Sequence, residues 1–243
     1  MLRFIILCIL LFTNNCSASD KFSFCKLGDG NFDDCLAKSI QTALRAIKSG
    51  YPEYGLKKFD PLFAGNFTIK GGTGPVQLDQ YHIDVEILGF SNLTVIKAHF
   101  DDKKKSLQIS TKLTRMIQQG NYVVDGKILA LPVVGNGKCT FWIDELDFPV
   151  TMDFQETKKD DKTYFKITSF RVGIHMKKMQ MNFENLFNGN KLLGDNINRV
   201  INENWDALFS DVRTSTEECY AGFLKRYAQD FFDKVPVDEI FLK

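Results

Sequence analysis

Between about Phe67 and Phe183 the chain alternates hydrophobic and polar residues with a period of two. This alternation is typical of strands that have one face on a core and the other in water. Polar runs separate the alternating segments, and we expect a turn at each run. Consecutive strands joined by short turns predict an antiparallel meander, and no helical segment lies between them to support a Rossmann-like fold. The expected turns are Gly71-Gly72-Thr73-Gly74, Asp101-Asp102-Lys103, Gly135-Asn136-Gly137 and Lys158-Lys159-Asp160-Asp161.

A helical period precedes this region. Either Asp33 or Asp34 is placed to cap the start of a helix, and Gly50 followed by Pro52 is placed to end it. We therefore expect a short amphipathic helix near the N-terminus. Its apolar stripe consists of Leu36, Ile40, Leu44 and Ile47.

A second helical region follows Phe183. Ser215 and Glu218 have the spacing of a capping box, and Pro236 would stop the helix. The pattern predicts either one long helix with a break near Thr214 or two helices in series. The first apolar stripe is Leu193, Ile197, Val200, Ile201, Trp205, Leu208, Phe209 and Val212. The second stripe is Tyr220, Phe223, Leu224, Tyr227, Phe231 and Val235.

The long C-terminal stripe must be covered, and the inner face of the sheet is the only large apolar surface that the sequence offers. A strongly curved antiparallel sheet wrapped around the long C-terminal helix would cover it. We therefore expect an α+β fold. No linker rich in Gly, Pro or Ser divides the region, so residues 20–243 are expected to form a single domain.

Residues 1–19 have the pattern of a secretory signal peptide. Arg3 gives a positive start, Phe4 to Phe12 are apolar, and Ser17-Ala18-Ser19 resembles a cleavage site. The apolar segment is too short to span a bilayer, and no later segment is long enough. We expect a secreted, extracellular protein with no stable membrane insertion.

Secretion changes the interpretation of the cysteines. Cys8 and Cys16 would leave with the signal peptide, and an even number in an oxidising compartment favours two disulfides. Three pairings are possible. The local pairing of the first two leaves the last two as partners, and no zinc-binding spacing is present. The remaining cysteines are Cys25, Cys35, Cys139 and Cys219.

Two sequons, at Asn66 and Asn92, are candidate glycosylation sites in that compartment.

Composition gives little support for catalysis. The 243 residues contain 31 basic and 30 acidic side chains, 22 Phe and 3 His. The near-neutral charge argues against nucleic-acid binding. No G-x-S-x-G or H-E-x-x-H motif occurs, and each His stands alone, as expected for a surface residue or for one whose hydrogen bonds are fully satisfied. We expect no enzyme activity, no metal site and no cofactor. The histidines are His82, His99 and His175.

An ordered set of short motifs covers the mature chain. Cys25 and Cys35 precede the first helix, and four segments follow: Asp60-Pro61-Leu62, Asn185-Leu186-Phe187-Asn188-Gly189, Leu193-Gly194-Asp195-Asn196 and Asn202-Glu203-Asn204-Trp205, with Val235-Pro236 near the end. This set resembles the insect takeout and juvenile hormone-binding protein family. The resemblance implies a tubular lipid-binding fold with an apolar tunnel for a small lipophilic ligand. It also implies that Cys25 pairs with Cys35.

We therefore expect a secreted, monomeric carrier that binds a juvenile-hormone-like terpenoid, a fatty acid or another lipid. The alternative is a secreted interaction or signalling protein with a filled core, and a secreted hydrolase is a more distant one. Tyr122 and Tyr164 are candidate polar partners of a ligand. The candidate tunnel residues are Val85, Ile87, Leu107, Ile109, Val124, Ile128, Phe141, Ile143, Phe148, Val150, Phe170, Val172, Ile197, Val200, Ile201, Trp205 and Leu208.

Overall fold

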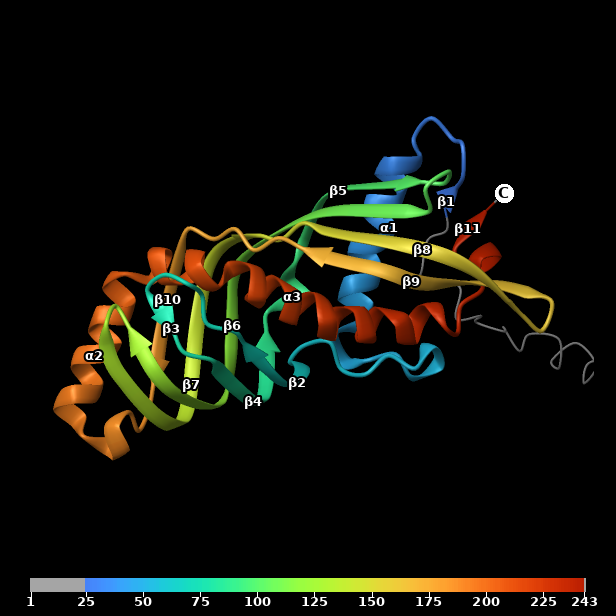
Figure 1. Ribbon diagram of the computed structural model, residues 1–243. Coiled ribbons are helices and arrows are strands. Elements are labelled where there is room, and N and C mark those ends of the chain that lie inside the picture. The colour runs from blue at the N-terminus through green and yellow to red at the C-terminus, as the bar shows by residue number, and fades with distance from the viewer. Residues whose placement is uncertain (1–24, 243) are drawn as a thin grey trace, which may run out of the picture.

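The computed structural model describes residues 25–242, and within them a curved antiparallel sheet lies along a long helix (Figure 1). The predicted signal peptide, with Cys8 and Cys16, lies outside the described residues. The α+β class and the wrapped C-terminal helix are confirmed. The helices are α1 (Phe32–Ala46), α2 (Lys191–Glu203) and α3 (Trp205–Phe232).

Nine strands form the main sheet, and all their pairings are antiparallel. They are β2 (Leu62–Ile69), β3 (Val76–Gln77), β4 (Gln80–Leu88), β5 (Thr94–Asp101), β6 (Ser106–Ile128), β7 (Leu131–Asp147), β8 (Val150–Lys159), β9 (Lys162–Val172) and β10 (Lys178–Phe183). A separate parallel pair joins the ends of the described chain: β1 (Cys25–Lys26) and β11 (Phe241–Leu242).

Strand β6 is the central strand of the sheet. It has 23 residues, so at about 3.3 Å per residue it reaches about 75 Å when extended. Residues 106–112 pair with β5 and, in part, with β8, whereas residues 112–128 pair with β7 and, in part, with β4. In Figure 1 the two groups of strands accordingly lie toward opposite ends of the molecule, with α3 running along both.

The inner face of β6 changes phase between these halves. The buried residues Leu107, Ile109 and Leu113 have odd numbers, whereas Met116 and Tyr122 have even ones. Thr114 and Arg115 are both exposed at the change. The paired strand β7 makes the same change near Glu145, which has a positive φ of 54°. The face of the two strands that points inward therefore changes at these residues, and each half of β6 and β7 directs its own set of side chains to the interior.

Helix α1 differs from the prediction at its first turn. Its N-cap is Asn31, so Asp33 and Asp34 lie inside the helix. There their carboxylates favour the positive end of the helix dipole without capping it. The end agrees with expectation, because Gly50, with φ of 90°, follows the short 3-10 turn Ile47–Ser49.

The two C-terminal helices meet at Asn204, so the predicted break near Thr214 is wrong. Ser215 lies in the middle of α3 and caps nothing. Its hydroxyl oxygen instead accepts a hydrogen bond from the backbone N–H of Lys70, at 2.7 Å. A capping-box pattern cannot be told by sequence from a serine that serves a neighbouring strand.

Side-chain amides of the helices satisfy the free edges of the sheet. Asn198 and Asn202 of α2 each accept from the backbone N–H and donate to the backbone carbonyl oxygen of one β10 residue, Phe183 and Met181 respectively, with distances of 2.7–2.9 Å. Gln229 of α3 makes the same kind of contact with β9. Edge strands that would otherwise expose unpaired groups are thereby closed against the helices.

The predicted turn at Gly135-Asn136-Gly137 is also wrong, because β7 continues through it. The turn between β6 and β7 lies at Leu129 and Ala130, both with positive φ. The two glycines are required for close packing instead. A Cβ atom at Gly135 would lie 2.7 Å from the Tyr122 hydroxyl, and one at Gly137 would lie 2.7 Å from the Glu184 carbonyl oxygen.

Candidate functional site: two internal apolar cavities

An apolar cavity of about 260 Å³ lies between α1, the sheet and the C-terminal half of α3. We call it the α1 cavity. Its volume approaches the lower end of the range of about 300–1,000 Å³ that is usual for small-molecule sites. The hydroxyls of Thr111 and Tyr227 on its wall already donate to the carbonyl oxygens of Phe148 and Lys57. The cavity therefore offers a ligand an almost purely hydrophobic surface.

Its wall combines residues from both ends of the chain. They are Ile40, Ala43, Leu44, Ile47, Leu56, Phe59, Phe90, Leu93, Leu107, Ile109, Thr111, Phe148, Val150, Met152, Phe170, Leu224, Tyr227, Ala228, Phe231 and Phe232.

A second cavity of about 60 Å³ lies under the N-terminal half of α3. We call it the methionine cavity, because Met116, Met176, Met179 and Met181 line it. Methionine side chains are flexible and repack readily, so this wall can adapt its shape. The other lining residues are Ile69, Val76, Gln80, Gln118, Ile128, Phe141, Ile143, Ile174, Phe183, Ile201, Leu208, Phe209, Val212, Thr216 and Tyr220.

Two aromatic rings, one from the wall of each cavity, lie against each other. Phe148 lines the α1 cavity and Tyr220 lines the methionine cavity, and their ring centroids lie 6.3 Å apart in an edge-on arrangement. Both side chains are almost completely buried. The two rings thus connect the walls of the two cavities, and we call this pair of side chains the partition.

A polar pair lies beside this partition. The Tyr220 hydroxyl donates to Oε1 of Gln118 at 2.7 Å, and Gln118 is only 2% exposed. Its Nε2 atom has no hydrogen-bond partner. A buried donor without a partner costs about 1–3 kcal/mol, so this amide is unlike its apolar neighbours on the inner face of β6.

His82 is a second buried polar residue with an unpaired atom. Its ring stacks on Phe67 at 5.2 Å, Phe141 meets it edge-on at 5.6 Å, and Nε2 has no partner. Burial lowers the pKa of His82 to about 4, so the imidazole is neutral near pH 7. The expectation of a surface or fully satisfied histidine is therefore wrong at this position.

Ten of the candidate tunnel residues lie on the cavity walls. Leu107, Ile109, Phe148, Val150 and Phe170 line the α1 cavity. The methionine cavity contains the other five: Ile128, Phe141, Ile143, Ile201 and Leu208. Their contact with a ligand stays a prediction.

Seven of the candidates line neither cavity. Five are buried in the packed core, and Val200 and Trp205 are partly exposed. The strands that hold the buried ones face inward as expected, but helices and neighbouring side chains fill the space beside them. The five core residues are Val85, Ile87, Val124, Val172 and Ile197.

Sequence reasoning missed the contribution of α1 and of the end of α3 to the wall. Both stripes were recognised as apolar, but neither was assigned to the ligand site. It also missed Gln118, although a signal was present: Gln118 follows Met116 and precedes Tyr122 at the spacing of inward-facing positions. A glutamine at such a position is a polar residue in the core.

The two tyrosines proposed as polar partners do not line the described cavities. The Tyr122 hydroxyl donates to the carbonyl oxygen of Glu184 at 2.6 Å. Tyr164 lies near the tip of the β8–β9 hairpin, opposite Thr157. Their contact with a ligand stays a prediction.

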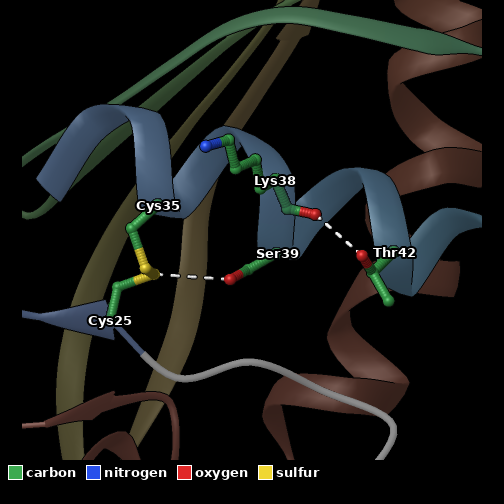
Figure 2. The surroundings of a disulfide bond; sticks show 5 residues. All are labelled: Cys25, Cys35, Lys38, Ser39 and Thr42. Atoms are coloured by element: carbon green, nitrogen blue, oxygen red, sulfur yellow. Dashed lines mark hydrogen bonds between the residues drawn. A yellow bond between two sulfur atoms is a disulfide. The ribbon is translucent and has the colours of Figure 1, made fainter. Parts of the chain in front are cut away.

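A disulfide joins Cys25 to Cys35 and so ties β1 to α1 (Figure 2). The Sγ atom of Cys25 also lies 3.3 Å from the hydroxyl oxygen of Ser39, one turn along the helix. Because α1 supplies part of the wall of the α1 cavity, this bond anchors one side of the site.

Within residues 25–242 the second predicted disulfide is absent, because Cys139 and Cys219 are both free there. Cys139 lies on β7, whereas the Cys219 thiol donates to the Thr68 carbonyl oxygen of β2, at 3.2 Å. Strands β6 and β4 lie between β7 and β2 in the sheet, so the two thiols are held beside strands that are not neighbours. The rings of His82 and Phe67 occupy part of this gap.

The side chains of both sequons, at Asn66 and Asn92, are exposed, and their glycosylation stays a prediction. Among residues 25–242, no helix has the length and apolar character needed to cross a bilayer. The same residues contain no group of three or more His, Cys, Asp or Glu side chains placed to hold a metal ion.

The sequence of this chain is similar to those of known proteins. The family model described as haemolymph juvenile hormone binding protein (JHBP) matches residues 5–242. The chain belongs to the JHBP family. It is 29% identical over 228 residues to the circadian clock-controlled protein daywake of Drosophila melanogaster, covering 90% of this chain and 86% of that one. The daywake protein of Drosophila yakuba is 26% identical over 226 residues, covering 89% of this chain and 85% of that one.

The fold of this JHBP-family chain is also found in a crystal structure. Takeout 1 of Epiphyas postvittana superposes with a TM-score of 0.79, covering 90% of this chain and 99% of that one, at 24% identity. This likeness confirms the tubular architecture predicted from the resemblance.

Proposed function

We propose that this protein is a secreted carrier that holds a small lipophilic ligand inside the tube. The observation that carries the proposal is the almost wholly apolar α1 cavity of about 260 Å³ between α1, α3 and the sheet. Membership of the JHBP family supports a binding protein, and no enzyme activity is proposed. The candidate ligands are a terpenoid, a fatty acid derivative or another lipid of comparable size.

The mechanism is burial. Each methylene group that leaves water for the cavity contributes about 0.8 kcal/mol before the costs of association. None of the described residues that line the two cavities carries a charge. The ligand therefore has to be neutral over the part that lies inside, because an unpaired charge in an apolar site is very costly.

The direct test is organic extraction of the purified protein followed by mass spectrometry, together with displacement of a neutral fluorescent probe by candidate lipids. The variant Ala228→Phe places a ring into the α1 cavity from α3. We expect it to reduce lipid binding by about ten-fold or more, because it removes the volume that a ligand needs.

The matched control is Ala207→Phe, which adds the same ring on an exposed position of the same helix. It should bind lipid as the natural protein does. If neither natural chain nor control binds any neutral lipid or probe, the carrier proposal fails. A signalling protein with a filled core would then be the better explanation.

A further inference from the structure

The polar pair beside the partition has a geometry that the burial of a hydrocarbon does not explain. Gln118 lies on β6 between Ile87 of β4 and Phe141 of β7, so its backbone position is fixed by pairing on both sides. The hydroxyl of Tyr220 fixes the amide through Oε1. The Nε2 group is left as a free donor in the wall of the methionine cavity.

The chemistry of this pair selects an acceptor. The hydroxyl proton of Tyr220 is already donated to Gln118, and the Nε2 atom of Gln118 can only donate. The group still free to hydrogen-bond with a ligand is therefore an N–H. No charged residue among those lining either cavity could balance a carboxylate. The site therefore favours a neutral oxygen, such as the carbonyl of an ester or a ketone, over an ionised acid.

The volumes on either side of the partition suggest how such a ligand would lie. The α1 cavity, at about 260 Å³, has room for a hydrocarbon chain. The methionine cavity, at about 60 Å³, has room for little more than a small end group. Rotation of the Phe148 ring away from Tyr220 would join the two spaces beside the amide.

We propose that Gln118 and Tyr220 form a recognition site for a neutral carbonyl lipid, with the chain in the α1 cavity, the carbonyl oxygen on Nε2 and the short end in the methionine cavity. The inference rests on the proposed carrier function and adds the class of ligand to it. It assigns a specificity role to Gln118, a polar residue at an inward position of β6 where an apolar side chain would otherwise be expected.

The experiment compares three probes of similar chain length: methyl laurate, lauric acid at pH 7.5 and tridecane. Their dissociation constants are measured by displacement of a neutral fluorescent probe from the full protein. A single neutral hydrogen bond is worth about a five-fold change in affinity, so methyl laurate should bind at least about five-fold more tightly than tridecane. Lauric acid should bind most weakly.

The variant Gln118→Met keeps the length of the side chain and removes its donors. The ratio of the tridecane to the methyl laurate dissociation constant should fall to about one. The control Gln108→Met changes an exposed glutamine of the same strand and should keep the ratio of the natural protein. Tyr220→Phe, which frees the amide from its fixed orientation, should lower the ratio partially and serves if Gln118→Met does not fold.

The outcomes distinguish failure of the recognition site from failure of the carrier function. If the natural protein binds all three probes equally, or if the ester preference survives in Gln118→Met, the recognition site is refuted while the carrier function stands. If the natural protein binds none of the probes, the carrier function fails and the recognition site fails with it.

Discussion

At the scale of single residues, His82 couples folding to pH. Its pKa is lowered to about 4 in the folded chain by burial, against about 6.5 when unfolded. Between these values the unfolded state binds a proton that the folded state does not. The stability contributed by the neutral imidazole is therefore full above about pH 6.5 and decreases as the pH falls toward 4.

We predict that the free energy of unfolding decreases by up to about 3 kcal/mol from pH 6.5 to pH 4 because of this residue alone. His82→Phe, which preserves the aromatic stack, should remove that part of the slope. Urea unfolding at several pH values measures it. His175→Gln, at an exposed position, is the control and should keep the slope. An unchanged slope in His82→Phe would contradict the assignment.

The free thiols give a second prediction at this scale. Burial raises the pKa of the Cys139 thiol to about 12, so the reactive thiolate is scarce. In the native protein Cys139 should resist alkylation, and Cys219, partly exposed, should react slowly. After denaturation without reductant both should be alkylated, as peptide mass mapping would show. Detection of a peptide that joins Cys139 to Cys219 would refute the free-thiol assignment.

At the scale of elements, the attachment of α2 to β10 depends on two asparagines. Asn202→Ala leaves the N–H and the carbonyl oxygen of Met181 without their partners. We predict a loss of about 1–3 kcal/mol in unfolding free energy, and faster hydrogen exchange at Met181. Asn196→Ala, an exposed asparagine on the same helix, should change stability by less than about 0.5 kcal/mol. Equal losses in the two variants would show that the contact does not matter.

Most of the elements could be predicted from periodicity, because alternation and helical stripes record which side of each element is buried. The errors have a common cause. Gly135 and Gly137 resembled a turn because their role, close approach of the segment around Leu186, depends on residues far away in sequence. Ser215 resembled a cap for the same reason, since its partner is Lys70.

The candidate site shows the same limit. Which apolar residues border an empty space depends on how large neighbouring side chains pack, and a pattern of burial carries no such information. Val85 and Ile87 are as inward-facing as Ile109, yet only Ile109 borders a cavity. The pairing of Cys139 with Cys219 failed because counting cysteines does not measure the distance between strands.

At the scale of the whole molecule, the two ends of the described chain pair with each other, and the disulfide links them to α1. The disulfide holds α1 to β1, and β1 pairs with β11 beyond the end of α3. We predict that Cys25→Ser combined with Cys35→Ser lowers the unfolding free energy by about 2–3 kcal/mol.

The same double variant should also weaken lipid binding, because Ile40 and Leu44 of α1 lose their anchor. Calorimetry and probe displacement measure the two effects. Ser39→Ala, which keeps the disulfide and removes the contact of Ser39 with Cys25, is the control and should retain binding. Unchanged affinity in the double variant would show that α1 is held in place by packing alone.

The change of phase in β6 has a consequence for how such a protein can diverge. Leu107 and Ile109 face the α1 cavity on odd positions, while Met116 and Gln118 face the methionine cavity on even ones. One continuous strand therefore lines both cavities, with odd-numbered residues facing the first and even-numbered residues facing the second. The change occurs at Thr114 and Arg115. Recombination with a relative at this junction, and near Glu145 on β7, would exchange strand segments of one compartment and leave those of the other intact. Loss of a single residue there would instead shift one half of β6 by one position, so the side chains that now face inward in that half would face outward.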